Sequence, residues 1–332
     1  SPRRTLPLSH ARPEAVRVLK MRTAHNHLST RTLSIDINIV FFPLTSRKRF
    51  VFSISSMVFR CCSVLFCLVF VMAFQPSSKA QNHKANDWME IESIPIAHSH
   101  NDYTRKNPLF DALYAGFRSI EIDLFAHEGQ LRVSHIALFL KRKPTIEELY
   151  VQPLLQILPD LERVLQAKGE SLEIMIDLKT GGKETIALLV KALEPLTPYL
   201  STWEGPTSIH KRSVTVVLSG GYPRDLFSYD TDVSMFFLDG RPCRCYGQPD
   251  LRITRVSAHY DQYFTWNGRG DMPKEEYEKL MECVYSAKRC HQKLRFWAMP
   301  QKKTIWRFFT EAGVEWINID HIKRFTRFVQ EK

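Results

Sequence analysis

Two carboxylates stand two residues apart in the apolar run Ser119-Ile120-Glu121-Ile122-Asp123-Leu124, and a histidine, His135, follows a short distance along the chain. Successive side chains of a strand point to opposite faces, so Glu121 and Asp123 share one face. With a rise of roughly 3.3 Å per residue, the two carboxylates lie about 7 Å apart along the strand, and both can bind one hard divalent cation. The pattern predicts a metal site on a strand.

Two further apolar runs end in ionisable groups. Ile94–Ala97 leads into His98, and Leu172–Leu178 carries Asp177 and is followed by Lys179. A cluster of carboxylates favours Mg²⁺ or Ca²⁺ over zinc, which prefers histidine and thiolate. We therefore predict Mg²⁺ or Ca²⁺, and not zinc, where the strand ends bring these carboxylates together. Lys179 lies on the same strand face as Asp177, where its positive charge favours an anion.

Two histidines from different strands, His98 and His135, suit proton transfer to and from a phosphate ester. One takes a proton from the attacking group and the other protonates the leaving oxygen. The reaction class that these residue types predict is phosphodiester cleavage. Attack by water and attack by a neighbouring substrate hydroxyl, which would produce a cyclic phosphate, are equally consistent with the sequence.

Apolar runs alternate with segments of helical spacing over the last 250 or so residues. Eight runs are expected to be strands: Ile94–Ala97, Ser119–Phe125, Leu172–Leu178, Val214–Leu218, Val233–Leu238, Ile253–Ala258, Leu294–Ala298 and Val314–Ile319. Helical spacing is found in Leu109–Ala115, Ile146–Lys168, Glu184–Leu193, Tyr222–Ser228, Lys274–Cys290 and Lys303–Ala312. This alternation is typical of a parallel sheet, and eight units predict an α/β fold that is a single (β/α)₈ TIM barrel.

In such a barrel the chemistry lies at the carboxyl ends of the strands. Asp239 and Asp320 also stand at strand ends, and we interpret both as caps of the following helices. Several aromatic residues near the expected mouth fit either stacking on a polyol or ordinary packing: Tyr103, Tyr260, Tyr263, Phe264, Trp266 and Trp297.

The N-terminal part of the chain differs in character from the rest. Residues 1–56 have no sustained periodicity and are interpreted as a disordered or non-native upstream extension. Residues 57–80 resemble a signal peptide, with a short basic start, a 14-residue apolar stretch and small residues before Ala80. A transmembrane anchor is the alternative, but a bilayer span needs about 20 apolar residues. We expect export, by secretion or to the periplasm, after cleavage near Ala80, and a barrel over residues 81–332.

The charge balance depends on that boundary. The whole chain carries 46 Lys and Arg against 35 Asp and Glu, whereas residues 81–332 hold 34 and 33. The barrel region is thus nearly neutral, which argues against nucleic acid as a partner. Four cysteines remain in it. Their spacing does not favour zinc, and it fits one disulfide from Cys243 or Cys245 to Cys283 or Cys290 as well as free buried thiols.

Four motifs in order carry a family resemblance. They are Ala97-His98, Ser119-Ile120-Glu121-Ile122-Asp123, Val133-Ser134-His135 and Asp177-Leu178-Lys179. Together they resemble the glycerophosphodiester phosphodiesterase and phosphatidylinositol-specific phospholipase C superfamily. The run from His98 to Tyr103, with Pro108 to Leu113, is most similar to the bacterial secreted and fungal branch, whose fungal members are called altered inheritance of mitochondria protein 6.

The resemblance implies a barrel phosphodiesterase of lipid metabolism. It implies that Glu121, Asp123 and Asp177 hold the metal and that His98 and His135 are the catalytic acid and base. The phosphate would be bound by Lys179, His100 and Asn101. In the better-known branch Arg-Gly follows the first histidine, whereas here Ser99-His100 follows, and His100 is expected to substitute for that arginine. The expected partner is a small-molecule or lipid-derived phosphodiester, with at most peripheral contact to a membrane.

Two other functions fit the same residues. Paired carboxylates on a barrel occur in glycoside hydrolases, although that chemistry leaves Lys179 and both histidines without a role. A non-catalytic metal-binding or phosphate-binding protein is the other alternative, because a fold does not determine a function.

Overall fold

The structure, a computed structural model, describes residues 85–245 and 247–331. The interpretations of residues 1–56 and 57–80 therefore concern residues outside the described part. Lys79–Lys332 forms one compact unit. No helix in the described ranges is both long enough and apolar enough to cross a membrane.

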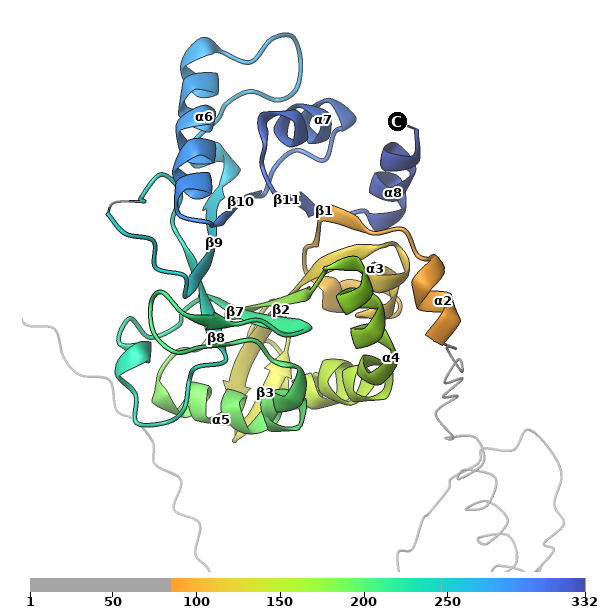
Figure 1. Ribbon diagram of the computed structural model, residues 1–332, viewed down its shortest axis with the longest axis vertical. Helices are drawn as coiled ribbons and strands as arrows, with labels where there is room; N and C mark the ends of the chain where they lie inside the picture. Colours follow the sequence, from red (N-terminus) through yellow and green to blue (C-terminus); the bar gives the residue numbers. More distant parts are fainter. Residues whose placement is uncertain (1–84, 246, 332) are drawn as a thin grey trace, which may run out of the picture. The chain divides into compact units, whose positions relative to one another are not determined.

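Eight parallel strands form a closed barrel in this unit. They are β1 (Ile94–Ser99), β2 (Phe117–His127), β4 (Leu172–Leu178), β7 (Val214–Gly220), β8 (Phe236–Gly240), β9 (Ile253–His259), β10 (Lys293–Trp297) and β11 (Trp316–Ile319). Each pairs in parallel with the next, and β1 pairs with both β2 and β11, which closes the ring (Figure 1). All eight predicted strands overlap these elements, so the predicted (β/α)₈ barrel is confirmed. One short strand, β3 (Gln130–Val133), adds to β2 in antiparallel fashion.

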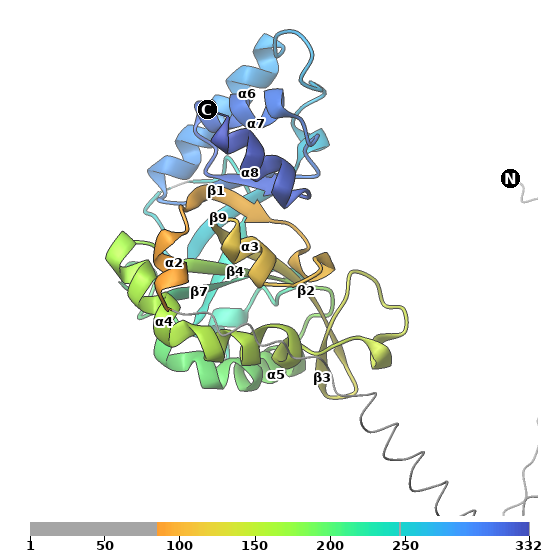
Figure 2. The ribbon, with the colours of Figure 1, turned by 90° about the vertical axis from the view of Figure 1, so that its right-hand side faces the viewer.

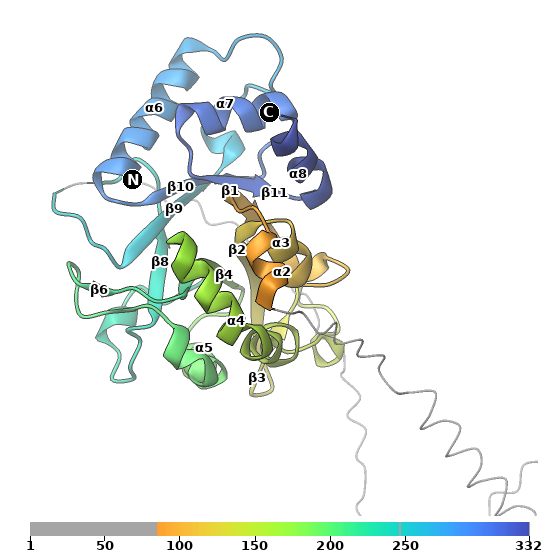
Figure 3. The same ribbon diagram turned by 45° about the vertical axis from the view of Figure 1, so that its right-hand side comes forward.

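Helices cover the outside of the barrel. They are α2 (Ala85–Glu90), α3 (Phe110–Tyr114), α4 (Gln152–Lys168), α5 (Lys183–Leu193), α6 (Lys274–Arg289), α7 (Lys303–Ala312) and α8 (Ile322–Gln330). In Figure 3, α6, α7 and α8 lie beside the strands β9 to β11, while α3 and α4 lie beside β2 and β4. A π-helical turn, Glu147–Val151, precedes α4.

The predicted helix over Tyr222–Ser228 is wrong. This segment forms only a 3-10 turn, Leu226–Ser228, in which Leu226 is the single buried residue. One buried side chain does not provide the apolar stripe that a packed helix needs. Helix α8 was not among the predicted helices, although Ile322, Phe325 and Phe328 form its buried face.

Two disulfides hold the connection between β8 and β9, which has no helix. Cys243 pairs with Cys283 and Cys245 with Cys290, so both tie this loop to α6. The sequence left one disulfide or free thiols open, and the structure pairs all four cysteines.

The strand register places the inward-facing side chains in layers. Ile120, Ile122 and Leu124 of β2 are fully buried toward the helices. The alternate residues of β2 point inward, where Glu121 is level with Met175 and Asp123 is level with Asp177. Asp123 and Asp177 therefore lie side by side in the layer nearest the carboxyl ends of the strands.

Below that layer the barrel interior is charged. Arg255 of β9 is fully buried, with a nitrogen 2.5 Å from Glu173 Oε1 and 2.8 Å from Ser119 Oγ. Arg295 of β10 lies 2.5 Å from Glu121 Oε2 and donates to Asn318 Oδ1. Each arginine neutralises one buried glutamate, because a buried charge without a partner costs several kcal/mol.

We expect Arg255→Met to lower the free energy of unfolding by about 3 to 5 kcal/mol, because the buried charge of Glu173 then has only the half-exposed Lys293, 3.8 Å away, as an ionic partner. Chemical denaturation measures the change. The double variant Arg255→Met/Glu173→Gln should regain a large part of the loss, since it removes both charges. Arg163→Met is the control, because this exposed residue only pairs with Asp160 on the surface. A loss below about 1 kcal/mol for Arg255→Met would contradict this account of the interior.

Candidate active site

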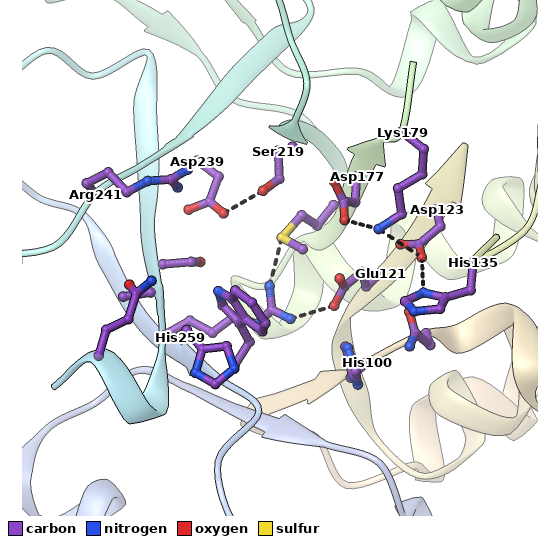
Figure 4. Close-up of a pocket in the computed structure, with 18 residues that line it drawn as sticks. His100, Glu121, Asp123, His135, Asp177, Lys179, Ser219, Asp239, Arg241 and His259 are labelled. Atoms are coloured by element: carbon purple, nitrogen blue, oxygen red, sulfur yellow. Dashed lines mark hydrogen bonds and ion pairs between the residues drawn. The ribbon is translucent and has the colours of Figure 1, made fainter. Parts of the chain in front are cut away.

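A cavity of about 410 Å³ opens at the carboxyl ends of the strands. Figure 4 shows its lining, to which seven of the eight barrel strands or their following loops contribute. The lining residues are His100, Asn101, Glu121, Asp123, His135, Met175, Asp177, Lys179, Ser219, Gly220, Asp239, Arg241, Ser257, Ala258, His259, Gln262, Arg295 and Trp297.

Three carboxylates meet on one wall of this cavity. Glu121, Asp123 and Asp177 each present an oxygen, and these atoms all lie within 4.8 Å of one another. Burial is the largest influence on Glu121 and raises its pKa, while the charge of Arg295 acts in the opposite direction. The cross-strand register of β2 and β4 creates this proximity, which the alternation in the sequence predicted.

Asp123 is the most connected member of this group. Its Oδ2 is 2.8 Å from His135 Nδ1, 2.9 Å from the Tyr103 hydroxyl, which donates to it, and 3.1 Å from Lys179 Nζ. Its Oδ1 is buried and has no hydrogen-bond partner. An unpartnered carboxylate oxygen beside two other carboxylates fits a hard divalent cation, which takes oxygen ligands.

Lys179 bridges two of the carboxylates, with its Nζ 2.5 Å from Asp177 Oδ2. Burial by itself lowers the pKa of Lys179, but the hydrogen bonds and charges of Asp177 and Asp123 outweigh it and raise the pKa above its usual value. The lysine therefore stays charged at neutral pH. A glycine makes room for Asp177, because a Cβ at Gly220 would come within 1.9 Å of Asp177 Oδ1.

Three histidines line the cavity, and a carboxylate orients two of them, His100 and His135, through Nδ1. His135 contacts Asp123 as described, and its side chain is 63% exposed. His100 Nδ1 lies 2.6 Å from Asp320 Oδ1. The interaction with His100 lowers the pKa of Asp320 even though burial alone would raise it. A histidine that donates its Nδ1 hydrogen to a carboxylate keeps Nε2 as the atom that exchanges protons.

His98 lies beneath the cavity and is not part of its lining. It is fully buried, with Nδ1 2.7 Å from Ser119 Oγ and Nε2 3.1 Å from Glu121 Oε2. Burial, together with the charges of Arg295 and Arg255, holds the pKa of His98 well below its usual value. Both ring nitrogens are thus already engaged, and the catalytic role predicted for His98 stays a prediction.

Asn101 and Asp102, which follow His100 in the chain, have different roles. Asn101 adopts a left-handed backbone conformation, with φ at 48°, and lines the cavity. Asp102 is buried and accepts hydrogen bonds from the Leu109 amide, at 2.6 Å, and from the hydroxyls of Ser99 and Tyr150. Asp102 therefore fixes the loop that carries His100 and Asn101.

The interpretation of Asp239 and Asp320 as helix caps is wrong. Asp320 makes no capping hydrogen bond to α8 and instead contacts His100, while Asp239 accepts from Ser219 Oγ at 2.8 Å. A capping preference is local, whereas these contacts cross between strands that are distant in sequence. The residue type was visible in the sequence, but the partners were not.

The wall opposite the carboxylate cluster is formed by other residue types. Asp239 is 2% exposed, its Oδ1 has no hydrogen-bond partner, and burial raises its pKa. Trp297 is 40% exposed and packs edge-on against His259. Of the six aromatic residues proposed near the mouth, Trp297 is the one in the lining, while Tyr260, Phe264 and Trp266 pack inside the fold. Arg241 and Arg295 are lining residues that the sequence analysis did not assign.

Comparison with known proteins adds a family match. Residues 87–239 match the model of the AIM6-like phosphodiesterase domain. Altered inheritance of mitochondria protein 6 from Eremothecium gossypii is 28% identical over 285 residues, which cover 72% of this chain and 70% of that protein. Its homolog from Arthroderma benhamiae is 28% identical over 262 residues, covering 70% of this chain and 82% of the homolog. A crystal structure of a glycerophosphodiester phosphodiesterase from Agrobacterium tumefaciens str. C58 aligns with a TM-score of 0.38 at 12% identity, over 71% of this chain and all of the other.

We expect this chain to bind one Mg²⁺ or Ca²⁺ and Asp123→Asn to weaken that binding at least about tenfold, because the variant removes the charge of the unpartnered oxygen. Isothermal titration calorimetry measures the affinity, and circular dichroism checks that the variant folds. Asp160→Asn is the matched control, because this residue of α4 does not line the cavity. Equal affinity of Asp123→Asn and the unaltered chain would contradict the predicted ligand set.

Proposed function

We propose that this chain, whose residues 87–239 match the model of the AIM6-like phosphodiesterase domain, is a hydrolase of glycerophosphodiesters or phospholipid-type head groups. One observation carries the proposal: a carboxylate cluster, a charged lysine and two carboxylate-oriented histidines line the same cavity. This combination meets the needs of phosphodiester cleavage, which are charge neutralisation at the phosphate and two proton transfers.

The cation site is part of the proposal. Glu121, Asp123 and Asp177 would hold Mg²⁺ or Ca²⁺, and the unpartnered Oδ1 of Asp123 supports this assignment. Such an ion, when bound, polarises a phosphoryl oxygen and lowers the pKa of a coordinated hydroxyl. Lys179 would then contact a second phosphoryl oxygen, because its Nζ lies at the edge of the same cluster.

His100 and His135 are the proposed proton-transfer pair. Each has Nδ1 engaged by a carboxylate, which leaves Nε2 to take a proton from the attacking group or to protonate the leaving oxygen. His98 becomes a positioning residue that holds Glu121 from below. This assignment departs from the pair predicted from the sequence, because His98 does not line the cavity.

The compartment in which the chain acts, its substrate and its products are also part of the proposal. The two disulfides support the expected export to an oxidising compartment. The substrate would be a small or lipid-derived phosphodiester. The products would be a monoester after attack by water or a cyclic phosphate after attack by a substrate hydroxyl.

We expect the full chain to hydrolyse bis(p-nitrophenyl) phosphate and sn-glycero-3-phosphocholine with Mg²⁺ or Ca²⁺, and excess EDTA to abolish both activities. Because p-nitrophenolate leaves without protonation, a variant of the acid histidine should lose activity mainly on the second substrate. No turnover of either substrate by a folded protein that binds the cation would favour the alternative of a binding protein. Cleavage of an aryl glycoside instead would favour a glycoside hydrolase.

Loss of His100 or of His135 should lower kcat. For His135→Ala and His100→Ala we expect a decrease in kcat on glycerophosphocholine of about 10²-fold to 10⁴-fold. Added imidazole should restore part of it, because both sites open into the cavity. His98→Ala should not be rescued, since its site is sealed. His210→Ala, on an exposed strand, is the matched control. Rescue of His98→Ala without rescue of His100→Ala would return the catalytic role to His98.

A further inference from the structure

A loop beside the cavity exposes three large apolar side chains within four residues. This loop, residues 134–143, follows β3 and is called the His135 loop here. Ile136, Leu138 and Phe139 are 54%, 52% and 66% exposed. Five other large hydrophobic residues in the described part of the chain are exposed, and they are scattered over other elements; of these, Tyr285 alone, at 66%, is as exposed as the three loop residues. A contiguous apolar group in water marks an interaction site more often than chance exposure does.

The backbone of the loop holds these side chains outward. Ser134 Oγ donates to the Ile136 carbonyl at 2.8 Å, and a 3-10 turn follows at Leu140–Arg142. Figure 2 shows the segment between β3 and α4 extending away from the helices that cover the barrel. The apolar side chains are therefore displayed by an ordered loop, and they do not fold back onto the core.

The charge of the segment favours an anionic partner. Residues 129–146 contain Arg132, Lys141, Arg142 and Lys143 and no acidic residue. Lys141 pairs with the neighbouring Glu128 at 2.7 Å, and the guanidinium of Arg142 lies 5.8 Å from the centre of the Phe139 ring. Positive charge directly beside exposed apolar side chains is the pattern that binds the interface of an anionic bilayer.

The loop also begins at the cavity. His135 is its second residue and lines the cavity, so the apolar group lies only one to four residues beyond the proposed proton-transfer site. A bilayer that receives the loop would have its head groups next to the cavity mouth. A soluble substrate would gain nothing from this placement.

We propose that the His135 loop inserts Ile136, Leu138 and Phe139 into the interface of an anionic phospholipid bilayer and so presents the cavity to lipid head groups. The consequence for turnover rests on the proposed function, whereas the binding itself does not. The proposal selects phospholipids in a membrane over free glycerophosphodiesters as the substrate class.

Vesicle sedimentation tests the binding without any need for turnover. The full chain and the compact unit Lys79–Lys332 are tested in parallel, with phosphatidylcholine vesicles that contain or lack phosphatidylserine. We expect binding to the anionic vesicles and a loss of at least about tenfold in Ile136→Ser/Leu138→Ser/Phe139→Ser. Tyr277→Ser/Tyr285→Ser, which removes exposed apolar side chains from α6, should bind like the unaltered protein. Lys141→Ser/Arg142→Ser should lose about fivefold per charge on anionic vesicles only.

Activity and oligomeric state complete the test. The triple serine variant should keep its turnover of bis(p-nitrophenyl) phosphate and lose hydrolysis of phospholipid in vesicles. No vesicle binding by the unaltered protein, or equal binding by the triple variant, overturns the proposal whether or not the chain is an enzyme. Dissociation of a dimer in the triple variant, measured by sedimentation velocity, would assign the loop to a second copy of the chain and would also overturn it.

Discussion

The pairing of two buried arginines with two buried glutamates supports the rest of the structure. Arg255 and Arg295 occupy the barrel interior, where aliphatic side chains are usual, and they neutralise Glu173 and Glu121. Without them the carboxylates on the inner face of β2 and β4 would have to be protonated or exposed to water. The negative cluster at the mouth can exist because positive charge lies directly below it.

The buried arginines also explain why the two histidines near β1 have different environments. His98 lies in β1 and His100 directly follows this strand, but only the His98 side chain faces Arg255 and Arg295. Their charges and its burial lower the pKa of His98, so it is neutral and hydrogen-bonded. His100 lies one layer higher, meets Asp320 and reaches the cavity. Their different depth therefore makes His98 a supporting residue below the cavity and places His100 in the cavity lining.

Asp123 joins the remaining parts of the site. One of its oxygens contacts Tyr103, His135 and Lys179, and the other has no hydrogen-bond partner. This arrangement orients His135 by a carboxylate of β2, so the next residue, Ile136, is not needed for that task. Ile136 is then free to serve the exposed loop. The chain thereby combines the proposed proton-transfer residue His135 and an exposed apolar group in one short segment.

The sequence by itself determined the eight strands, their parallel order and the carboxylates that share a face, because strand alternation and the periodicity of helices are local properties. It also indicated Glu121, Asp123 and Asp177 as one cluster, since neighbouring parallel strands end at the same edge. The partners of Asp239 and Asp320, the pairing of four cysteines, the place of His98 below the cavity and the arginines of the interior were decided by tertiary structure. Those contacts depend on how far each strand is shifted against the next and on how the ring closes between β1 and β11, and no short stretch of sequence carries that information.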